Sequence, residues 1–498
     1  MKQLTRRDFL KTSAVAGLAF GMPSLATAGS ADSEVRIAMV GLGGIKIPGS
    51  VGGRGRQLIK SFREVPGVKI AALCDVDKAV LEDGVKLFKD RGETVTAYSD
   101  PRRVFDDKSI DAVVLAIPNH WHALGTIWAC QAGKDVYVEK PFSYNIWEGR
   151  QMVAAASKYK RIVQVGTQRR SSAALPQAFD YLRSGQIGAI RFAHALIYRA
   201  RTGIGKVSEP TPVPETMDYD IWCGPAPKTP VMRKQLHYEW HWVWPTGNGE
   251  MGNNGVHVTD ICRWGLGMNQ PPPRAMSIGG RFAFDDAGET PNTHVAIFDY
   301  QPVPIICEIR NVSKVPDAKG AEGMGKFRGA SGGIVFVCEG GYFAGDYTGG
   351  TVFDNEGKKL KEFKDGRKTG EIEIAHATNF IAAVRSRKAD TLAAGPSVGY
   401  GSAACCHMAN VSHRLGKQSS PGEIRERVRS NGELLDAFER CRESLRENGV
   451  DLGATPATLG PWVTFDSKQA CFTGEFGDQA NQLSRRQDRA PFVVPKLA

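Results

Sequence analysis

Five short apolar runs alternate with helix-favouring stretches between residues 35 and 166, and this alternation constrains the fold more than any other feature. The apolar runs cover residues 35–40, 68–75, 112–117, 135–139 and 162–166. The stretches between them favour helices at 55–64, 78–91, 121–132 and 145–159. Runs that are apolar on both faces suit buried parallel strands. The pattern therefore predicts a doubly wound parallel sheet in which helices connect successive strands.

The pattern changes after about residue 170, where strands follow one another with few helices between them. The expected strands cover 189–200, 276–284, 293–300, 304–311 and 333–338. Strands joined without crossover helices indicate a mostly antiparallel sheet, and hence a second domain. Helices are expected near 375–387, 399–415 and 431–447, followed by an irregular polar tail. The predicted fold class is α/β, with an N-terminal parallel sheet and a C-terminal α+β domain built on a large, open, mostly antiparallel sheet.

The N-terminal segment has the features of an export signal. Arg6-Arg7 is followed by Phe9-Leu10-Lys11, a short apolar run at 14–22 and Ala26-Thr27-Ala28. Paired arginines before a short apolar region and a small-x-small site are typical of twin-arginine export. The apolar run is too short for a stable membrane span. We therefore expect the twin-arginine translocase as a partner, cleavage near Ala28, and a periplasmic or secreted protein.

Charge and cysteine content exclude several other classes. The net charge is +11, but Lys and Arg are scattered among acids after the signal, and no nucleic-acid-reading motif is found. The ten cysteines include no Cys-x-x-Cys pair, and a metal site is not predicted. A protein exported after folding in the reducing cytosol has little use for disulfides. Most cysteines are therefore expected to be small buried core residues.

A glycine-rich turn follows the first expected strand. Gly41 and Gly43 fit a Gly-x-Gly-x-x-Gly turn, but Lys46 stands at the third glycine position. An insertion at about 45–52, with Gly55 as the third glycine, restores the pattern. Such turns let a backbone approach a dinucleotide pyrophosphate at a helix N-terminus. Asp75 ends the second strand, where an acid binds ribose hydroxyls and repels a ribose phosphate, so a Rossmann domain that prefers NAD to NADP is expected.

Three further segments carry a family resemblance. They are Ile117-Pro118-Asn119-His120-Trp121-His122-Ala123, the run from Ala132 to Glu139-Lys140-Pro141, and Val163-Gln164-Val165-Gly166-Thr167-Gln168-Arg169-Arg170. Together they resemble the glucose-fructose oxidoreductase / inositol dehydrogenase family, Gfo/Idh/MocA, in its secreted branch. The resemblance implies a two-domain enzyme that assembles as a dimer or tetramer. The expected domains are a signal at 1–28, the NAD-binding domain at 34–169, a substrate and oligomerisation domain at 170–418 and a C-terminal extension at 419–498.

The resemblance also implies the site residues. Lys140 would lie beside the nicotinamide and the reacting hydroxyl, where an ammonium stabilises a developing alkoxide. His257 falls on the family's catalytic histidine, with Asn253 at the position of its usual acid; Asp260, one helical turn on, would orient the ring. The cofactor-binding candidates are Gly41, Gly43, Gly55, Asp75, Asn119, His122, Glu139 and Lys140. The substrate-binding candidates are Asn253, Arg169, and His241 and Trp242 of a tryptophan-rich segment.

Three functional hypotheses follow. The first is an oxidoreductase that moves hydride between a sugar, polyol or glycoside carbon and a tightly held NAD. The second is glycoside cleavage by oxidation and elimination, which returns the hydride and needs no external NAD pool. The third is a catalytically silent, NAD-bound sugar-binding protein, because Asn253 replaces the acid. The sequence leaves open the sugar, the carbon oxidised and the oligomer size.

Overall fold

The structure is a computed structural model that describes residues 34–43 and 53–498. The predicted signal, its cleavage site near Ala28 and the predicted insertion at 45–52 lie outside the described residues. Within the described part of the chain, no helix combines the length and apolar character that crossing a bilayer requires.

The N-terminal domain is built on a six-stranded parallel sheet with the order β3-β2-β1-β4-β5-β6. Its strands are β1 (Val35–Val40), β2 (Val68–Cys74), β3 (Thr96–Tyr98), β4 (Ala112–Leu115), β5 (Asp135–Val138) and β6 (Val163–Val165). The connecting helices are α1 (Arg54–Arg63), α2 (Lys78–Lys89), α3 (Pro101–Asp106), α4 (His122–Gln131) and α5 (Ile146–Lys158). The strand order reverses between β1 and β4, which opens a crevice at their carboxyl ends.

The second domain is built on a large mixed sheet with the order β14-β13-β12-β11-β7-β10-β9-β8-β16-β15. Among the described strand pairs of this second sheet, only β7 and β10 run parallel. The sheet is therefore mostly antiparallel, as predicted, and the α/β class is confirmed. Its strands are β7 (Ile190–Tyr198), β8 (Arg274–Gly280), β9 (Thr293–Phe298), β10 (Ile305–Arg310), β11 (Gly333–Cys338), β12 (Gly341–Asp346), β13 (Gly349–Asp354), β14 (Lys359–Lys364), β15 (Lys417–Ser419) and β16 (Ala457–Leu459). A short ribbon, β17 (Val463–Asp466) and β18 (Cys471–Thr473), joins it through β8.

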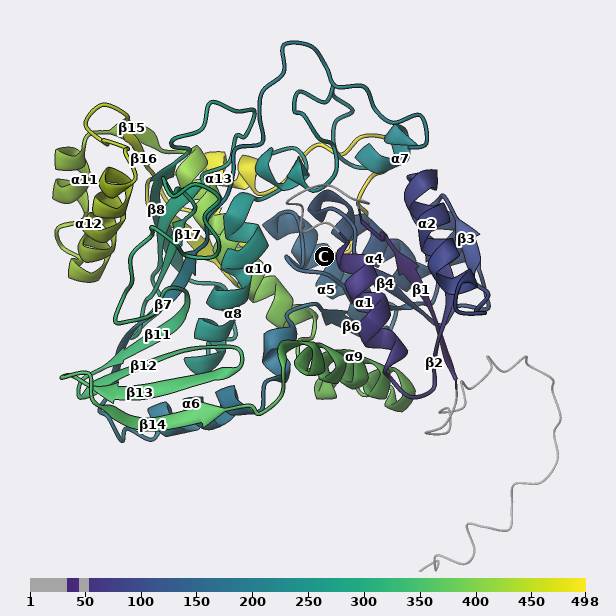
Figure 1. Ribbon diagram of the computed structural model, residues 1–498, viewed down its shortest axis with the longest axis horizontal. Helices are drawn as coiled ribbons and strands as arrows, with labels where there is room; N and C mark the ends of the chain where they lie inside the picture. Colours follow the sequence, from purple (N-terminus) through teal and green to yellow (C-terminus); the bar gives the residue numbers. More distant parts are fainter. Residues whose placement is uncertain (1–33, 44–52) are drawn as a thin grey trace, which may run out of the picture.

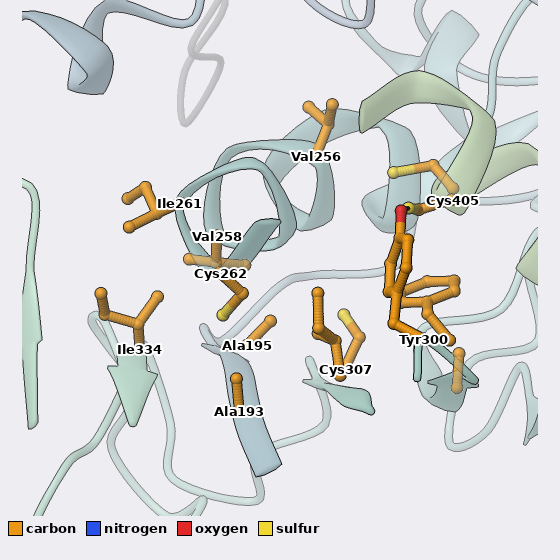
Figure 2. Close-up of a cluster of buried hydrophobic side chains, with 14 of the residues drawn as sticks. Ala193, Ala195, Val256, Val258, Ile261, Cys262, Tyr300, Cys307, Ile334 and Cys405 are labelled. Atoms are coloured by element: carbon orange, nitrogen blue, oxygen red, sulfur yellow. Dashed lines mark hydrogen bonds between the residues drawn. The ribbon is translucent and has the colours of Figure 1, made fainter. Parts of the chain in front are cut away.

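Helices fill the space between the two sheets, as Figure 1 shows for α8 and α10. They are α6 (Ala174–Arg183), α8 (Val256–Gly265) and α10 (Pro396–Arg414). Val258, Ile261 and Cys262 of α8 pack against side chains of β7, β10 and β11 (Figure 2). Nine of the ten cysteines are buried, five of them in this core and the others in neighbouring cores. This packing fixes α8, and so fixes the residues at its start that face the N-terminal domain.

The chain crosses back to the N-terminal domain after the large sheet. Helix α9 (Thr369–Ser386) lies in the range expected for the second domain, yet Phe380 and Ile381 pack against Phe62 and Tyr137 of the first. The short helix α7 (Tyr219–Cys223) belongs to a long segment that arches over the N-terminal domain (Figure 1). The two domains are therefore interleaved rather than joined by one linker.

The C-terminal extension is more regular than its sequence indicates. Helices α11 (Pro421–Val428) and α12 (Gly432–Glu447) cover the outer face of β8, β9 and β10 with side chains such as Phe438 and Leu445. Where an irregular tail was expected, the structure has β16, β17, β18 and α13 (Gly477–Leu483). Strands of three or four residues are too short to show an alternating pattern in sequence. The expected dimer or tetramer stays a prediction.

The glycine-rich turn depends on a close approach of Gly55 to Gly41. A Cβ at residue 55 would overlap the carbonyl oxygen of Gly41, so Gly55→Ala is expected to cost about 2 kcal/mol of unfolding free energy. Gly432→Ala is the matched control, because a Cβ there meets nothing within 4 Å. Urea unfolding of both variants measures the difference; equal stabilities would contradict the close approach.

Candidate active site

A cleft of about 430 Å³ lies at the carboxyl ends of β1, β4 and β5 and against the second domain. Its volume falls in the range of small-molecule sites. One end holds the glycine turn and Asp75, and the other holds Lys140 and His257. The residues after 170 that line it are Arg199, Arg201, Ile221, Trp222, His237, Tyr238, Trp240, His241, Asn253, Asn254, His257 and Glu373, and Arg169 lies at the junction.

The glycine-turn end has the features of a dinucleotide site. Gly41 has a φ of +83°, and a Cβ there would lie 2.5 Å from the carbonyl oxygen of Ala116. Helix α1 begins at Arg54 with no side-chain cap, so its first N–H groups face the cleft end without a side-chain acceptor. Gly41, Gly43 and the α1 N-terminus would therefore hold a diphosphate.

Asp75 is fixed beside this turn by backbone hydrogen bonds. Its carboxylate accepts from the N–H of Leu42 at 2.8 Å and of Asp77 at 3.1 Å. Burial raises the pKa of Asp75, and these two hydrogen bonds oppose the rise. An oriented carboxylate at this point suits the hydroxyls of an adenosine ribose.

Glu139 is held by an ion pair rather than left free in the cleft. Its carboxylate accepts from Arg54 Nε at 2.8 Å and from the Lys140 backbone N–H at 3.2 Å. Burial favours a higher pKa for Glu139, but the charges of Arg54 and Lys140 hold the pKa below its ordinary value. A Cβ at Gly166 would lie 2.7 Å from this carboxylate, so the neighbouring strand must carry glycine there. Glu139 therefore fixes the loop that presents Lys140.

Lys140 joins the two domains. Its Nζ donates to the backbone oxygen of Asn253 at 2.9 Å and to Asn253 Oδ1 at 3.0 Å. Burial lowers the pKa of Lys140 to about 8, although Glu139 opposes the effect. A lysine with this pKa exchanges a proton readily near neutral pH.

A buried ion pair supports Asn253 from below. Asn253 lies in the π-helical turn η5 (Met251–Gly255), which begins directly after Glu250. Glu250 is fully buried, and its carboxylate accepts from Arg201 Nη2 at 2.9 and 3.0 Å and from Asn254 and Asn253 Nδ2. Burial opposes ionisation, but Arg201 and Asn254 hold the pKa of Glu250 at about 2. The family's usual acid is replaced by Asn253, but a carboxylate is present three residues earlier, at Glu250, where it is buried and contacts Asn253.

Two histidines line the reacting end with unpartnered ring nitrogens. His257 is 6% exposed, and its Nδ1 is buried without a hydrogen-bond partner among the described residues. His241 Nδ1–H donates to the Tyr238 carbonyl oxygen at 2.6 Å, while its Nε2 has no partner in the described chain. Burial, then nearby positive charge, lowers the pKa of His257 well below 6.5. Burial also lowers the pKa of His241, to about 3. Both rings are therefore neutral at pH 7 and available to a polar ligand.

Four predicted site residues do not line the cleft: Gly55, which packs against Gly41, and His122, Trp242 and Asp260. Both ring nitrogens of His122 lie at hydrogen-bonding distance from carbonyl oxygens, of Pro141 at 2.7 Å and Ile117 at 2.9 Å, and the ring N–H donates to one of them, so His122 holds the loop after Lys140. Trp242 is 4% exposed and packs under Arg281, whose guanidinium carbon lies 4.9 Å from the ring centre. The expected pairing of Asp260 with His257 is wrong.

Asp260 instead belongs to a buried structural network. Its carboxylate accepts from Arg170 Nε at 2.8 Å and from Ser402 Oγ at 2.6 Å. The i,i+3 spacing placed Asp260 near His257 in sequence, but the carboxylate is directed toward the arginine of the neighbouring segment because a buried charge needs an opposite one.

Sequence reasoning missed several residues of the site. Glu250, Arg201 and Tyr238 contact or support Asn253, and Arg54 pairs with both Glu139 and Glu373. The Glu-x-x-Asn spacing of 250 and 253 was the one available signal, since residues three apart share a helical face. Nothing in the sequence shows that Arg201 pairs with this acid.

Comparisons with known proteins agree with this geometry. Residues 35–167 match the description "Oxidoreductase family, NAD-binding Rossmann fold", and residues 198–311 match "Oxidoreductase family, C-terminal alpha/beta domain", both of Gfo/Idh/MocA. The chain carries both domains of the Gfo/Idh/MocA oxidoreductase family. Residues 3–23 match a twin-arginine translocation signal, which confirms the predicted export signal. The cleavage site near Ala28 stays a prediction.

Curated relatives align with about a third of the chain. Inositol 2-dehydrogenase of Salmonella paratyphi B is 27% identical over 158 residues, covering 32% of this chain and 46% of the relative. A glycosyl hydrolase family 109 protein of Saccharopolyspora erythraea is 32% identical over 173 residues, covering 32% of this chain and 38% of the relative. The alignments thus span less than half of these relatives.

Solved structures share the fold at low identity. The WlbA dehydrogenase from Bordetella pertussis, in complex with NADH and UDP-GlcNAcA, has a TM-score of 0.51 at 17% identity, over 74% of this chain and 93% of that one. An oxidoreductase from Agrobacterium radiobacter, in complex with NAD+, L-tartaric acid and magnesium, has a TM-score of 0.52 at 15% identity, over 77% of this chain and 96% of that one.

The Glu250–Arg201 pair generates a stability prediction. Glu250→Gln leaves Arg201 buried without its counter-ion and is expected to cost about 3 kcal/mol of unfolding free energy. Glu443→Gln is the control, because that pair with Arg446 is exposed and screened by solvent. Since the pKa of Glu250 is lowered to about 2, the contribution of the pair is present at neutral pH and is lost as the pH falls from about 4 toward 2. Urea unfolding at pH 7 and pH 3 tests this; equal losses in the two variants at pH 7 would contradict it.

Proposed function

We propose that this protein is an exported NAD-dependent oxidoreductase that acts on a CH–OH carbon of a sugar, polyol or glycoside. The observation that carries the proposal is that Lys140 and His257 line the same cleft as Gly41 and Asp75. A proton-exchanging group and a dinucleotide site in one cleft are what hydride transfer from an alcohol needs. Inositol dehydrogenases among the relatives support a polyhydroxylated substrate.

The geometry divides the chemistry among the chain's own residues. Bound nicotinamide would supply hydride acceptance and return. Lys140 is the better proton acceptor near neutrality, because a base works best when its pKa lies near the working pH. His257 is a very weak base in this site, so its role is to accept a hydrogen bond and orient the substrate hydroxyl. Asn253 holds the Lys140 amine in place from the second domain.

The segment that arches over the N-terminal domain supports a tightly held cofactor. It bonds to the loop after β2, through Lys78 N–H to the Thr216 carbonyl at 2.9 Å and Asp218 N–H to the Val76 carbonyl at 3.0 Å. His237 of the same segment pairs with Asp77 at 3.2 Å and lines the cleft. The ribose-binding end is therefore covered by the second domain. A retained NAD suits an exported enzyme, which meets no obvious pool of free NAD.

A second candidate is glycoside cleavage through transient oxidation. Similarity to glycosyl hydrolase family 109 proteins favours it. Hydride leaves a ring carbon, the adjacent C–H then loses a proton, and the glycosidic C–O bond breaks with the alcohol as leaving group; water adds and the hydride returns. Release of the aryl alcohol from an aryl glycoside without accumulation of reduced cofactor would favour cleavage. A ketosugar product would favour simple oxidation.

The proposed function is tested on natively exported protein. Mass spectrometry of the denatured protein is expected to find NAD that survives dialysis, and a panel of sugars, polyols and glycosides is expected to contain a substrate. Lys140→Ala is expected to reduce turnover at least about 100-fold. Loss of NAD on dialysis would contradict only the claim that the protein retains its cofactor, and not the assigned chemistry. Turnover unchanged in Lys140→Ala would overturn the assigned chemistry, and a protein that binds NAD but turns over nothing would favour the silent binding protein.

The proton role of Lys140 predicts a pH dependence. Burial lowers its pKa to about 8, so the neutral amine that accepts the hydroxyl proton accumulates as the pH rises, and kcat/KM for oxidation should rise and level off above about pH 8. Lys140→Arg should remove this limb, because a guanidinium does not deprotonate in the range. Exposed Lys158→Arg is the control. A limb that persists in Lys140→Arg and disappears in His257→Asn would assign the proton to His257 instead.

A further inference from the structure

The arginines that line the cleft differ in how they are neutralised. Arg54 pairs with Glu139 and Glu373, and Arg201 pairs with Glu250. Arg169 has no carboxylate within ion-pairing distance in the described chain, and its guanidinium has no hydrogen-bond acceptor there either. Arg169 is thus an uncompensated charge on the wall of the cleft.

A stacking contact holds Arg169 without using its donors. The guanidinium carbon lies 4.6 Å from the ring centre of Tyr347, in the turn between β12 and β13. The Tyr347 hydroxyl shares a hydrogen bond with Thr369 Oγ1 at 3.2 Å, which fixes the ring. Stacking on an aromatic face leaves the guanidinium N–H edges free. The site therefore presents an oriented fork of donors.

The positive charge of Arg169 acts on Lys140 and His257 at the reacting end of the cleft. Burial is the main cause of the low pKa values of Lys140 and His257, and Arg169 lowers both further. Gly41 follows β1, whereas Lys140 follows β5 and Arg169 follows β6, and β4 lies between β1 and β5. The glycine turn therefore lies away from Arg169 along the cleft. An anion at Arg169 would accordingly belong to the substrate and not to the cofactor.

The neighbouring residues give the site the same sign of charge. Arg199 lines the cleft and is exposed, with no ion pair among the described residues. The nearest acids that act on Arg169 are Asp346 and Asp260, and Asp260 is already paired with Arg170. Burial lowers the pKa of Arg169 to about 10, so it stays charged at neutral pH. An unpaired, partly desolvated cation is stabilised when an anion binds.

We propose that Arg169 is a carboxylate-binding residue and that the substrate is an acidic sugar of the uronic acid class, with Arg199 attracting it at the mouth of the cleft. This rests on the proposed function, because it concerns the substrate half of the same site. A guanidinium fork matches a carboxylate with two parallel hydrogen bonds. Binding there places the carboxylate at Arg169 and the ring hydroxyls toward Lys140 and His257.

Calorimetric titration of the cofactor-loaded protein tests the proposal. The probes are glucuronate, galacturonate and mannuronate, each compared with its parent hexose, together with glucose 6-phosphate. At least one uronate should bind about tenfold or more tightly than its hexose, and Arg169→Gln should reduce that ratio at least about tenfold. Arg169→Lys should restore part of it, because the ammonium keeps the charge without the fork.

Arg446→Gln is the matched control, because it removes the same charge from the exposed face of α12. The ratio should be unchanged in this variant. The proposal is overturned if no uronate binds more tightly than its hexose, if Arg169→Gln leaves the ratio intact, or if glucose 6-phosphate binds more tightly than every uronate, which would assign a phosphate.

Titration does not require turnover, so the two proposals fail separately. Uronate binding that depends on Arg169 without any hydride transfer would contradict the oxidoreductase and leave the carboxylate site standing. Turnover of neutral sugars with no preference for uronates would contradict the carboxylate site and leave the oxidoreductase standing.

Discussion

The two hydrogen bonds from Lys140 Nζ to Asn253 are the contact on which the site depends. Lys140 follows β5 of the parallel sheet, and Asn253 precedes α8 of the second domain. The bond therefore fixes the relative position of a cofactor-binding fold and a substrate-binding fold at the point where they meet. Beneath it, the Glu250–Arg201 pair holds the π-helical turn, and the packing of α8 on the large sheet holds the helix that follows.

Burial also decides which group does which task. Lys140 and His257 are both desolvated, and both lose affinity for protons, but they begin from different ordinary values. The pKa of Lys140 is lowered to about 8, where a group exchanges protons near neutral pH. The pKa of His257 is lowered well below neutral pH, so its ring stays unprotonated. Arg169 is also desolvated, but its guanidinium stays charged at neutral pH and has no ion-pair partner in the described chain.

The sequence predicted what depends on local pattern. The alternation of apolar runs and helices was enough for the parallel sheet. The sequence also singled out Gly41, Gly43 and Asp75, which line one cleft in the structure, while their binding of a cofactor stays a prediction. Gly55, taken as the third glycine across an insertion, does approach Gly41.

The sequence could not show which way a side chain points or which residue far along the chain it pairs with. Trp242 and Trp240 are two residues apart, yet Trp240 lines the cleft and Trp242 packs away from it. Arg169 and Arg170 are adjacent, yet one lines the cleft and the other neutralises Asp260. Such choices are set by long-range pairing of buried charges, which no spacing rule contains.

The proposed catalysis requires that a substrate carbon beside Lys140 lies against the nicotinamide ring, while the rest of the dinucleotide extends along the same cleft to Gly41 and Asp75. The most direct measurement is isotope transfer on protein that carries its own bound cofactor. A substrate labelled with deuterium at the oxidised carbon is expected to deliver that label to the nicotinamide, seen as a one-dalton gain in the reduced cofactor by mass spectrometry. Label that appears only in water, or that stays on an otherwise converted substrate, would contradict the account.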